Sequence, residues 1–124
     1  MKDAKRLAQK RFVDGDRLLV FVPPNCRECL PVINQLVGLL LSTQQSGVDV
    51  YIRDAQDDES VRAWANAHAI KAAWLNGRHL TLNRDEELLQ RLKGQSTVST
   101  ADAMPIFLKR NGRFFQLSRE SLGL

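Results

Sequence analysis

The chain has 124 residues, of which 44% are hydrophobic and 26% are charged, and its net charge is +4. This composition excludes disordered and fibrous chains and indicates one globular domain. No apolar run reaches the roughly 18 residues of a transmembrane helix, so we predict no membrane span. The segment Met1–Arg17 is mostly polar and has no apolar signal core, which leaves open whether the protein works where it is made or has lost a targeting segment.

The basic residues are scattered along the sequence, and their densest group lies within Lys2–Arg11. No zinc-finger, helix-turn-helix or aromatic pattern accompanies them, so we interpret them as a solvated surface and do not expect nucleic acid as a partner.

Apolar spacing and turn residues predict seven elements before a hairpin of two strands and a final short helix. The first half of the chain is expected to form a helix over Lys5–Phe12, a buried strand over Arg17–Val22, a helix from Asn25 to Leu41 and a strand over Val48–Ile52. A helix from Asp57 to near Ile70, a strand over Arg78–Leu82 and a helix between Asn83 and Gly94 should follow. The chain should end with a hairpin of Ile106–Lys109 and Arg113–Leu117 and a short helix from Ser118.

Two helix starts are predicted from capping boxes. Asn25 with Glu28 predicts the first, and Asn83 with Glu86 predicts the second. Pro31 would then fall in the second turn of its helix and bend the axis, because proline lacks a backbone donor.

A strand–helix–strand order implies parallel pairing, whereas Asn111-Gly112 predicts an antiparallel hairpin. We therefore expect one α/β domain over residues 1–124 with a central mixed β-sheet flanked by helices. We also expect residues from about 71 to 103 to form a small insertion before the final hairpin.

Both cysteines of the chain lie in one C-x-x-C motif, Cys26-Arg27-Glu28-Cys29, between a buried strand and a helix. A helix N-terminus favours a thiolate at Cys26, which makes it the predicted nucleophile. Cys29, one turn further on, would be more buried and could resolve a mixed disulfide. Arg27 should favour the thiolate and Glu28 should oppose it.

Three other interpretations of the cysteine pair stay open. A zinc site would need about four ligands, and His68 and His79 do not match a known spacing, so we expect no metal. A purely structural disulfide would constrain little chain entropy across so short a loop. The third interpretation is a pair of inert thiols.

The segments Arg17–Cys29, Val48–Ile52 and Ala103–Leu117 resemble the thioredoxin-like superfamily. The resemblance implies a three-layer fold and thiol–disulfide exchange on protein substrates, with no cofactor, because the cysteine pair carries the electrons. It also implies that Met104 binds an extended substrate through its backbone and that the bond before Pro105 is cis.

The sequence also departs from this superfamily. The dipeptide between the cysteines is unusual, and Asn25 stands where an aromatic residue is common. The buried carboxylate of thioredoxins has no match within Leu18–Val22. Proton transfer to Cys29 would therefore rely on water or on Glu28.

A narrower resemblance covers Val48–Ile70 and Leu80–Asp85, which look like the thioredoxin-like proteins of bacterial integrating conjugative elements. It implies a periplasmic location and partners in the conjugation apparatus; the alternative location is cytoplasmic. The competing functional hypothesis is a non-catalytic thioredoxin-fold binding or assembly module of that apparatus. Reductase, oxidase and isomerase directions are not distinguished.

Four residues outside the motif have structural interpretations. We interpret His68 as a partly buried helix residue, His79 as exposed, and Trp64 and Trp74 as packing residues. The acidic cluster Asp54–Glu59 lacks the spacing of a calcium loop, so we assign it to helix capping.

Overall fold

The computed structural model describes residues 12–26, 28–40, 43–68, 70, 75, 77, 79–85, 87–94, 104–118 and 120–122. Most of the predicted helix Lys5–Phe12, the residue Trp74 and the predicted loop Gln95–Ala103 lie outside these residues. The elements of the described chain are β1 (Arg17–Val22), α2 (Cys29–Leu40), β2 (Gly47–Ile52), α3 (Asp58–Ala67), β3 (Leu80–Arg84), α5 (Leu88–Lys93), β4 (Ile106–Arg110), β5 (Arg113–Leu117) and the 3-10 turn η1 (Glu120–Leu122).

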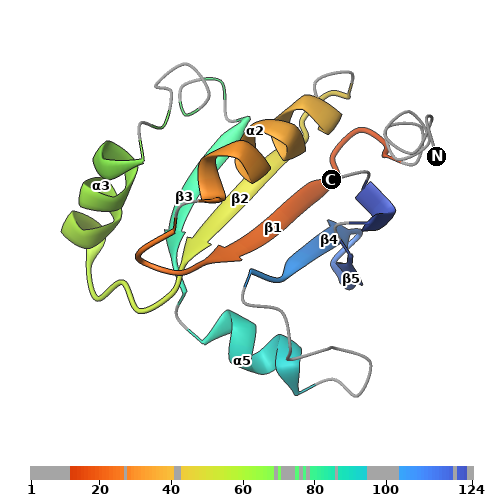
Figure 1. Ribbon diagram of the computed structural model, residues 1–124. Helices are drawn as coiled ribbons and strands as arrows, with labels where there is room; N and C mark the ends of the chain where they lie inside the picture. The colour runs from red at the N-terminus through yellow and green to blue at the C-terminus, as the bar shows by residue number, and fades with distance from the viewer. Residues whose placement is uncertain are drawn as a thin grey trace.

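The strands form one five-stranded sheet in the order β3-β2-β1-β4-β5 (Figure 1). β1, β2 and β3 are mutually parallel, whereas β4 runs antiparallel to β1 and β5 antiparallel to β4. This arrangement confirms the predicted mixed sheet. β1 lies at its centre, and its residues from Leu18 to Val22 are all buried, as expected for a strand covered on both faces.

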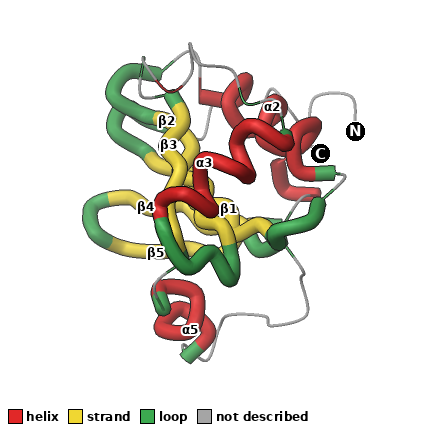
Figure 2. Tube along the Cα trace, turned by 90° about the vertical axis from the view of Figure 1, so that its left-hand side faces the viewer, coloured by secondary structure: helices red, strands yellow, loops and turns green. Residues whose placement is uncertain are grey.

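Helices cover both faces of the sheet. α2 and α3 pack on one face, where Ile33, Val61 and Trp64 join the larger apolar core. α5 lies on the other side of the strands (Figures 1 and 2), where Leu89 and Leu92 pack against β1 and β4. The order β1, β2, β3 steps across the sheet in one direction, so two right-handed crossovers place α2 and α3 on the same face.

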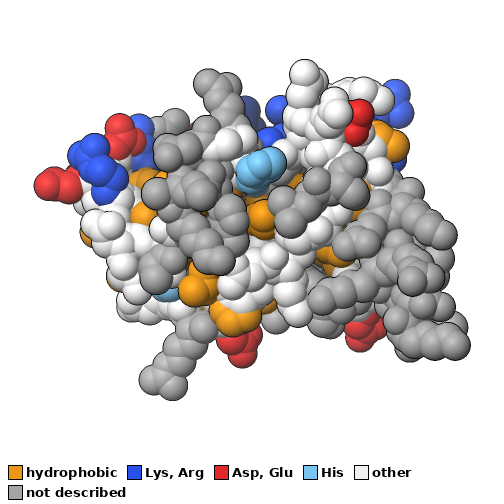
Figure 3. Space-filling view, turned by 90° about the horizontal axis from the view of Figure 1, so that it is seen from above, with side chains coloured by type: hydrophobic (Ala, Val, Ile, Leu, Met, Phe, Trp, Pro, Cys, Tyr) orange, Lys and Arg blue, Asp and Glu red, His pale blue; other side chains and the backbone are white. Residues whose placement is uncertain are grey.

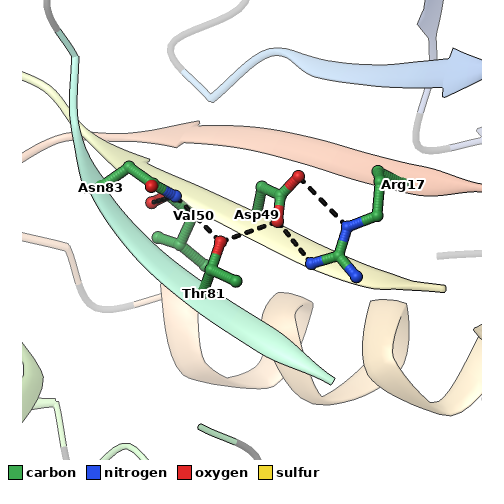
Figure 4. Close-up of polar contacts among 5 residues, drawn as sticks. All are labelled: Arg17, Asp49, Val50, Thr81 and Asn83. Carbon is green, nitrogen blue, oxygen red and sulfur yellow. Dashed lines mark hydrogen bonds and ion pairs between the residues drawn. The ribbon is translucent and has the colours of Figure 1, made fainter. Parts of the chain in front are cut away.

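β3 is an edge strand and lies within the segment 71–103 that precedes the hairpin. A polar network joins it to its neighbours (Figure 4): Arg17 pairs with Asp49, Thr81 donates to Asp49 at 2.7 Å, and Asn83 donates to Thr81 at 2.9 Å and to the Val50 carbonyl at 3.3 Å. The network ties β1, β2 and β3 together through side chains of one sheet face.

The predicted boundaries of β3 and α5 were wrong. The strand covers Leu80–Arg84 rather than Arg78–Leu82, because Asn83 bonds within the sheet. Asn83 therefore does not cap a helix. α5 begins later, and the carboxylate of Asp85 accepts the backbone N–H of Leu89 at 3.2 Å. The predicted end at Gly94 is confirmed.

α2 also begins later than predicted, at Cys29 instead of directly after Asn25. Its first backbone bond runs from Val32 N–H to the Glu28 carbonyl at 3.3 Å. A helix starting at Asn25 would need the N–H of residue 31, which proline lacks. Pro31 therefore sits in the first turn of α2, where an intrahelical donor is not required, and the predicted bend in the second turn does not arise.

α3 begins as the acidic residues predict, with Asp57 as its N-cap. The Asp57 carboxylate accepts hydrogen bonds from the backbone N–H and the hydroxyl of Ser60, both at 2.8 Å. These bonds hold the pKa of Asp57 below its usual range. The helix ends at Ala67, with His68 as its C-cap, slightly before the predicted end near Ile70.

The predicted hairpin is confirmed. Asn111 and Gly112 connect β4 to β5 with φ angles of 53° and 76°, the left-handed values that a two-residue type I′ turn requires.

None of the helices in the described part of the chain is long and apolar enough to cross a membrane. On the face shown in Figure 3, basic side chains of the described residues lie near the upper edge, with acidic ones among them, and do not gather in one basic patch.

Candidate thiol–disulfide site

The two cysteines lie at the carboxyl end of β1, the central strand, and form a disulfide bond. Cys26 is half-buried in the loop that follows β1, whereas Cys29 is the first residue of α2 and has no exposed surface. The predicted difference in burial is confirmed. One sulfur of the pair is therefore closer to solvent than the other, as sequential attack and resolution require.

Met104 lies beside the cysteine pair, and Pro105 follows it directly before β4. The Sδ atom of Met104 is 3.8 Å from the Sγ atom of Cys29, and Met104 is 3% exposed. The Pro105 carbonyl accepts the backbone N–H of Phe21 at 3.1 Å. This bond fixes the Met104-Pro105 segment against the end of β1 that leads to Cys26.

The expectation of a cis bond before Pro105 was wrong, because the structure has no cis peptide bond among the described residues. An X–Pro bond prefers trans by about 0.5–1 kcal/mol, and only packing that favours the cis form overcomes this preference. Here the trans segment already buries the Met104 side chain on Cys29 and pairs the Pro105 carbonyl with β1.

α3 supplies two residues to the site that the sequence did not assign to it, Trp64 and His68. Trp64 Nε1–H donates to the Pro23 carbonyl at 3.3 Å, and His68 Nε2 lies 3.1 Å from the Cys26 carbonyl oxygen. The two rings stack with centroids 4.2 Å apart. The predicted burial of Trp64 and partial burial of His68 are confirmed, but both also hold the loop that carries Cys26.

A groove of about 340 Å³ lies next to this loop. Pro24 and Asn25 form one wall, and the α3 side chains that include Trp64 and His68 form another. The residues that follow β2, among them Arg53, close it. The groove thus reaches Asn25, the residue that precedes Cys26.

No family model matches the sequence, and no curated protein matches it. The structure is similar to that of a thioredoxin-like protein from Aeropyrum pernix, with a TM-score of 0.58 and 11% identity over 93% of this chain and 78% of the other. The fold is thioredoxin-like. A secreted disulfide oxidoreductase from Mycobacterium tuberculosis is also similar, with a TM-score of 0.49 and 13% identity over 89% of this chain and 80% of the other.

The other two predicted site residues, Arg27 and Glu28, stand between the cysteines in the sequence. Glu28 is exposed and directly precedes α2, and its carbonyl accepts the first bond of that helix. Arg27 lies outside the described residues.

The described residues contain no group of three or more histidine, cysteine, aspartate or glutamate side chains placed to hold a metal ion. His79 is exposed and directly precedes the edge strand β3. His68 Nε2 faces the Cys26 carbonyl, and His68 Nδ1 faces the Trp64 carbonyl within α3.

Proposed function

We propose that the protein is a thiol–disulfide oxidoreductase that acts on protein substrates through Cys26 and Cys29. The observation that carries this proposal is the disulfide at the end of the central strand, with one sulfur half-buried and the other fully buried. The thioredoxin-like fold supports it, because the fold presents such a pair beside the segment preceding β4.

In the reducing direction the Cys26 thiolate attacks a substrate disulfide. A bond forms between Cys26 and one substrate sulfur, and the other substrate sulfur leaves as a thiolate. The Cys29 thiolate then attacks Cys26, which closes the Cys26–Cys29 disulfide and releases the second substrate thiolate. Two electrons pass from the cysteine pair to the substrate, and the reverse sequence oxidises a substrate dithiol.

Substrate binding is assigned to both sides of Cys26. On one side, the backbone of Met104 is the proposed partner for an extended substrate strand, with Pro105 holding that segment against β1. On the other side, the groove next to Asn25 is the proposed seat of neighbouring substrate residues. Arg27 is proposed to favour the Cys26 thiolate, and Glu28 is proposed to oppose it. No cofactor is required.

The narrower resemblance supports a more specific role. We propose a periplasmic accessory of conjugative transfer whose clients are disulfide-bonded parts of the transfer apparatus. An oxidising compartment suits a protein whose cysteines are paired. Fractionation of cells that make the native protein checks the location, and recovery only in the cytoplasmic fraction contradicts it.

Trapping of mixed disulfides tests the proposed function. A Cys29→Ser variant should accumulate a disulfide between Cys26 and a client protein, because the resolving thiol is absent. The matched Cys26→Ser variant should accumulate far less, because Cys29 is fully buried. Mass spectrometry after alkylation identifies the linked cysteine.

A redox titration in glutathione buffers gives the second readout. A potential between roughly −270 and −120 mV is expected of an exchange catalyst. Equal trapping by both variants, or a potential well below about −300 mV, contradicts catalysis. Either result would favour a non-catalytic binding or assembly module as the function.

A further inference from the structure

Trp64 of α3 and its C-cap residue His68 contact the Cys26 loop at two points. Trp64 Nε1–H donates to the carbonyl of Pro23, the first residue after β1, at 3.3 Å. His68 Nε2 lies 3.1 Å from the carbonyl oxygen of Cys26 itself. These contacts join residues 41 and 42 positions apart in the sequence. The position of Cys26 therefore depends on α3 as well as on the neighbouring helix α2.

Both ring nitrogens of His68 face oxygen atoms that can only accept hydrogen bonds. Nδ1 lies 2.9 Å from the Trp64 carbonyl and Nε2 lies 3.1 Å from the Cys26 carbonyl. A neutral imidazole has one N–H and can donate to only one of these oxygens, whereas an imidazolium donates to both. Both contacts can be hydrogen bonds at the same time only in the doubly protonated form of the ring.

His68 lies next to the residue that carries the proposed nucleophile, because its Nε2 is 3.1 Å from the Cys26 carbonyl oxygen. The Trp64 ring covers one face of the imidazole, with centroids 4.2 Å apart. The charged side chains that line the same groove, Arg53 and Asp54, have opposite signs and follow β2. A cation beside a thiol favours its thiolate form.

We propose that His68 is a positioning residue for thiol–disulfide exchange: its Nε2–H holds the Cys26 carbonyl, and its charged form favours the Cys26 thiolate. The inference rests on the proposed function and deepens it. A thiolate stabilised in the reduced protein shifts the equilibrium toward the dithiol, so His68 makes the pair a stronger oxidant. The effect requires no contact between His68 and substrate.

Three variants separate the two effects. His68→Phe keeps an aromatic ring against Trp64 but removes both donors, and His68→Ala removes ring and donors. His68→Gln keeps an amide N–H donor without a charge. His79→Ala is the matched control, because His79 is the other histidine of the chain and is exposed. Circular dichroism shows which variants are folded, and His68→Gln is the most conservative of them.

In the reduced protein, all three His68 variants should move the Cys26 thiolate midpoint, followed by absorbance, up by about half a pH unit or more. At a pH well above both midpoints, the equilibrium constant with glutathione should shift toward the disulfide by about threefold or more, which is the same change expressed as a ratio. His79→Ala should match wild type. Wild-type values in all three folded His68 variants overturn the role of the charge.

Amide hydrogen exchange of the oxidised protein tests the positioning role without any exchange chemistry. His68→Ala and His68→Phe should speed exchange of backbone amides in residues 25–29, while His68→Gln should restore part of the protection. Unchanged exchange in His68→Ala and His68→Phe overturns the positioning role. Failure of wild type to equilibrate with glutathione would instead contradict the proposed function, so the two failures are distinguishable.

Discussion

The sulfur atoms of Cys29 and Met104 lie 3.8 Å apart in the apolar core on the α2 side of the sheet. Both residues are almost fully buried, and every residue of the adjoining segment Leu18–Val22 is apolar and buried. β1 therefore offers no carboxylate to move a proton to or from Cys29. The methionine side chain fills space beside the Cys29 sulfur and contributes to stability in this way.

Substitution of Met104 tests this packing role. Met104→Ala should lower the free energy of unfolding by about 2–5 kcal/mol, since it leaves a cavity beside Cys29. Met104→Leu, which nearly conserves volume, should cost less than about 1.5 kcal/mol and keep glutathione exchange, because the proposed substrate contact uses the backbone. Urea unfolding measures both. Equal losses of unfolding free energy in Met104→Ala and Met104→Leu would contradict the packing role of Met104.

At the residue scale, the sequence predicted the burial of Trp64 and His68 but not their contacts with the Cys26 loop. Their spacing on the apolar face of a helix predicted burial, and both are buried or half-buried. Their contact with the Cys26 loop spans more than 40 residues of sequence, and periodicity carries no information about which loop a helix end meets. The four-residue spacing of two aromatic rings was the available signal, because such side chains stack on one helix face.

At the scale of elements, the predicted start of α2 and the predicted end of β3 were wrong. A missing backbone donor set the first boundary, and side-chain hydrogen bonds set the second. The capping pattern of Asn25 and Glu28 was plausible, but Pro31 removes the N–H that an earlier start of α2 would use. Asn83 matched a cap equally well, yet its amide bonds to Val50 and Thr81 in the sheet. Turn signals were more dependable, because a left-handed conformation restricts the residue type directly.

Gly112, in the turn between β4 and β5, and Gly38, in α2, allow a test in which substitution by alanine should change the free energy of unfolding in opposite directions. Gly112 has φ of 76°, and a Cβ added there would meet no atom within 4 Å. Gly112→Ala should therefore cost about 1–2 kcal/mol from backbone strain alone. Gly38 lies within α2 and also has open space around an added Cβ, without a positive φ. Gly38→Ala should stabilise by up to about 1 kcal/mol.

Thermal or urea unfolding of the two variants side by side is the measurement. A Gly112→Ala variant as stable as wild type would contradict the type I′ turn. Loss of stability in Gly38→Ala would show that its surroundings in α2 are tighter than the structure has them.

For the whole molecule, the strand–helix–strand order predicted parallel pairing and helices on a mixed sheet, and both are confirmed. The position of β3 was not predictable in the same way. A strand from residues 80–84 could join the sheet beside β2 or stand apart, and the choice depends on bonds such as those between Asp49 and Thr81. These form only once the sheet exists.

The molecule also places a buried ion pair and the cysteine pair at opposite ends of β1. β1 carries the cysteines after its last residue, whereas Asp16 precedes its first, about 20 Å away along the strand. The Asp16 carboxylate is 1% exposed and accepts two hydrogen bonds from Arg110, at 2.9 and 2.6 Å, and one from Val13 N–H at 3.0 Å. This ion pair joins the start of β1 to the end of β4.

Burial acts to raise the pKa of Asp16, but the hydrogen bonds and the charge of Arg110 outweigh it, so the pKa lies below its usual range. A carboxyl whose pKa is lowered by folding stabilises the native state above its unfolded pKa, near about 3.9, and this contribution is lost as the pH falls through the lower folded value. The free energy of unfolding should therefore decline below about pH 4 partly through Asp16.

Asp16→Asn should lower the free energy of unfolding at pH 7 by about 1–3 kcal/mol, because the amide cannot accept both bonds from Arg110. The difference from wild type should narrow as the pH falls below about 4, since the wild-type carboxyl then becomes neutral as well. The exposed Glu120→Gln should show neither effect. A difference that stays constant from pH 7 to pH 2 would contradict the role of the Asp16 charge. The glutathione equilibrium of Cys26 and Cys29 should be unchanged in Asp16→Asn, because the ion pair and the disulfide lie at opposite ends of β1.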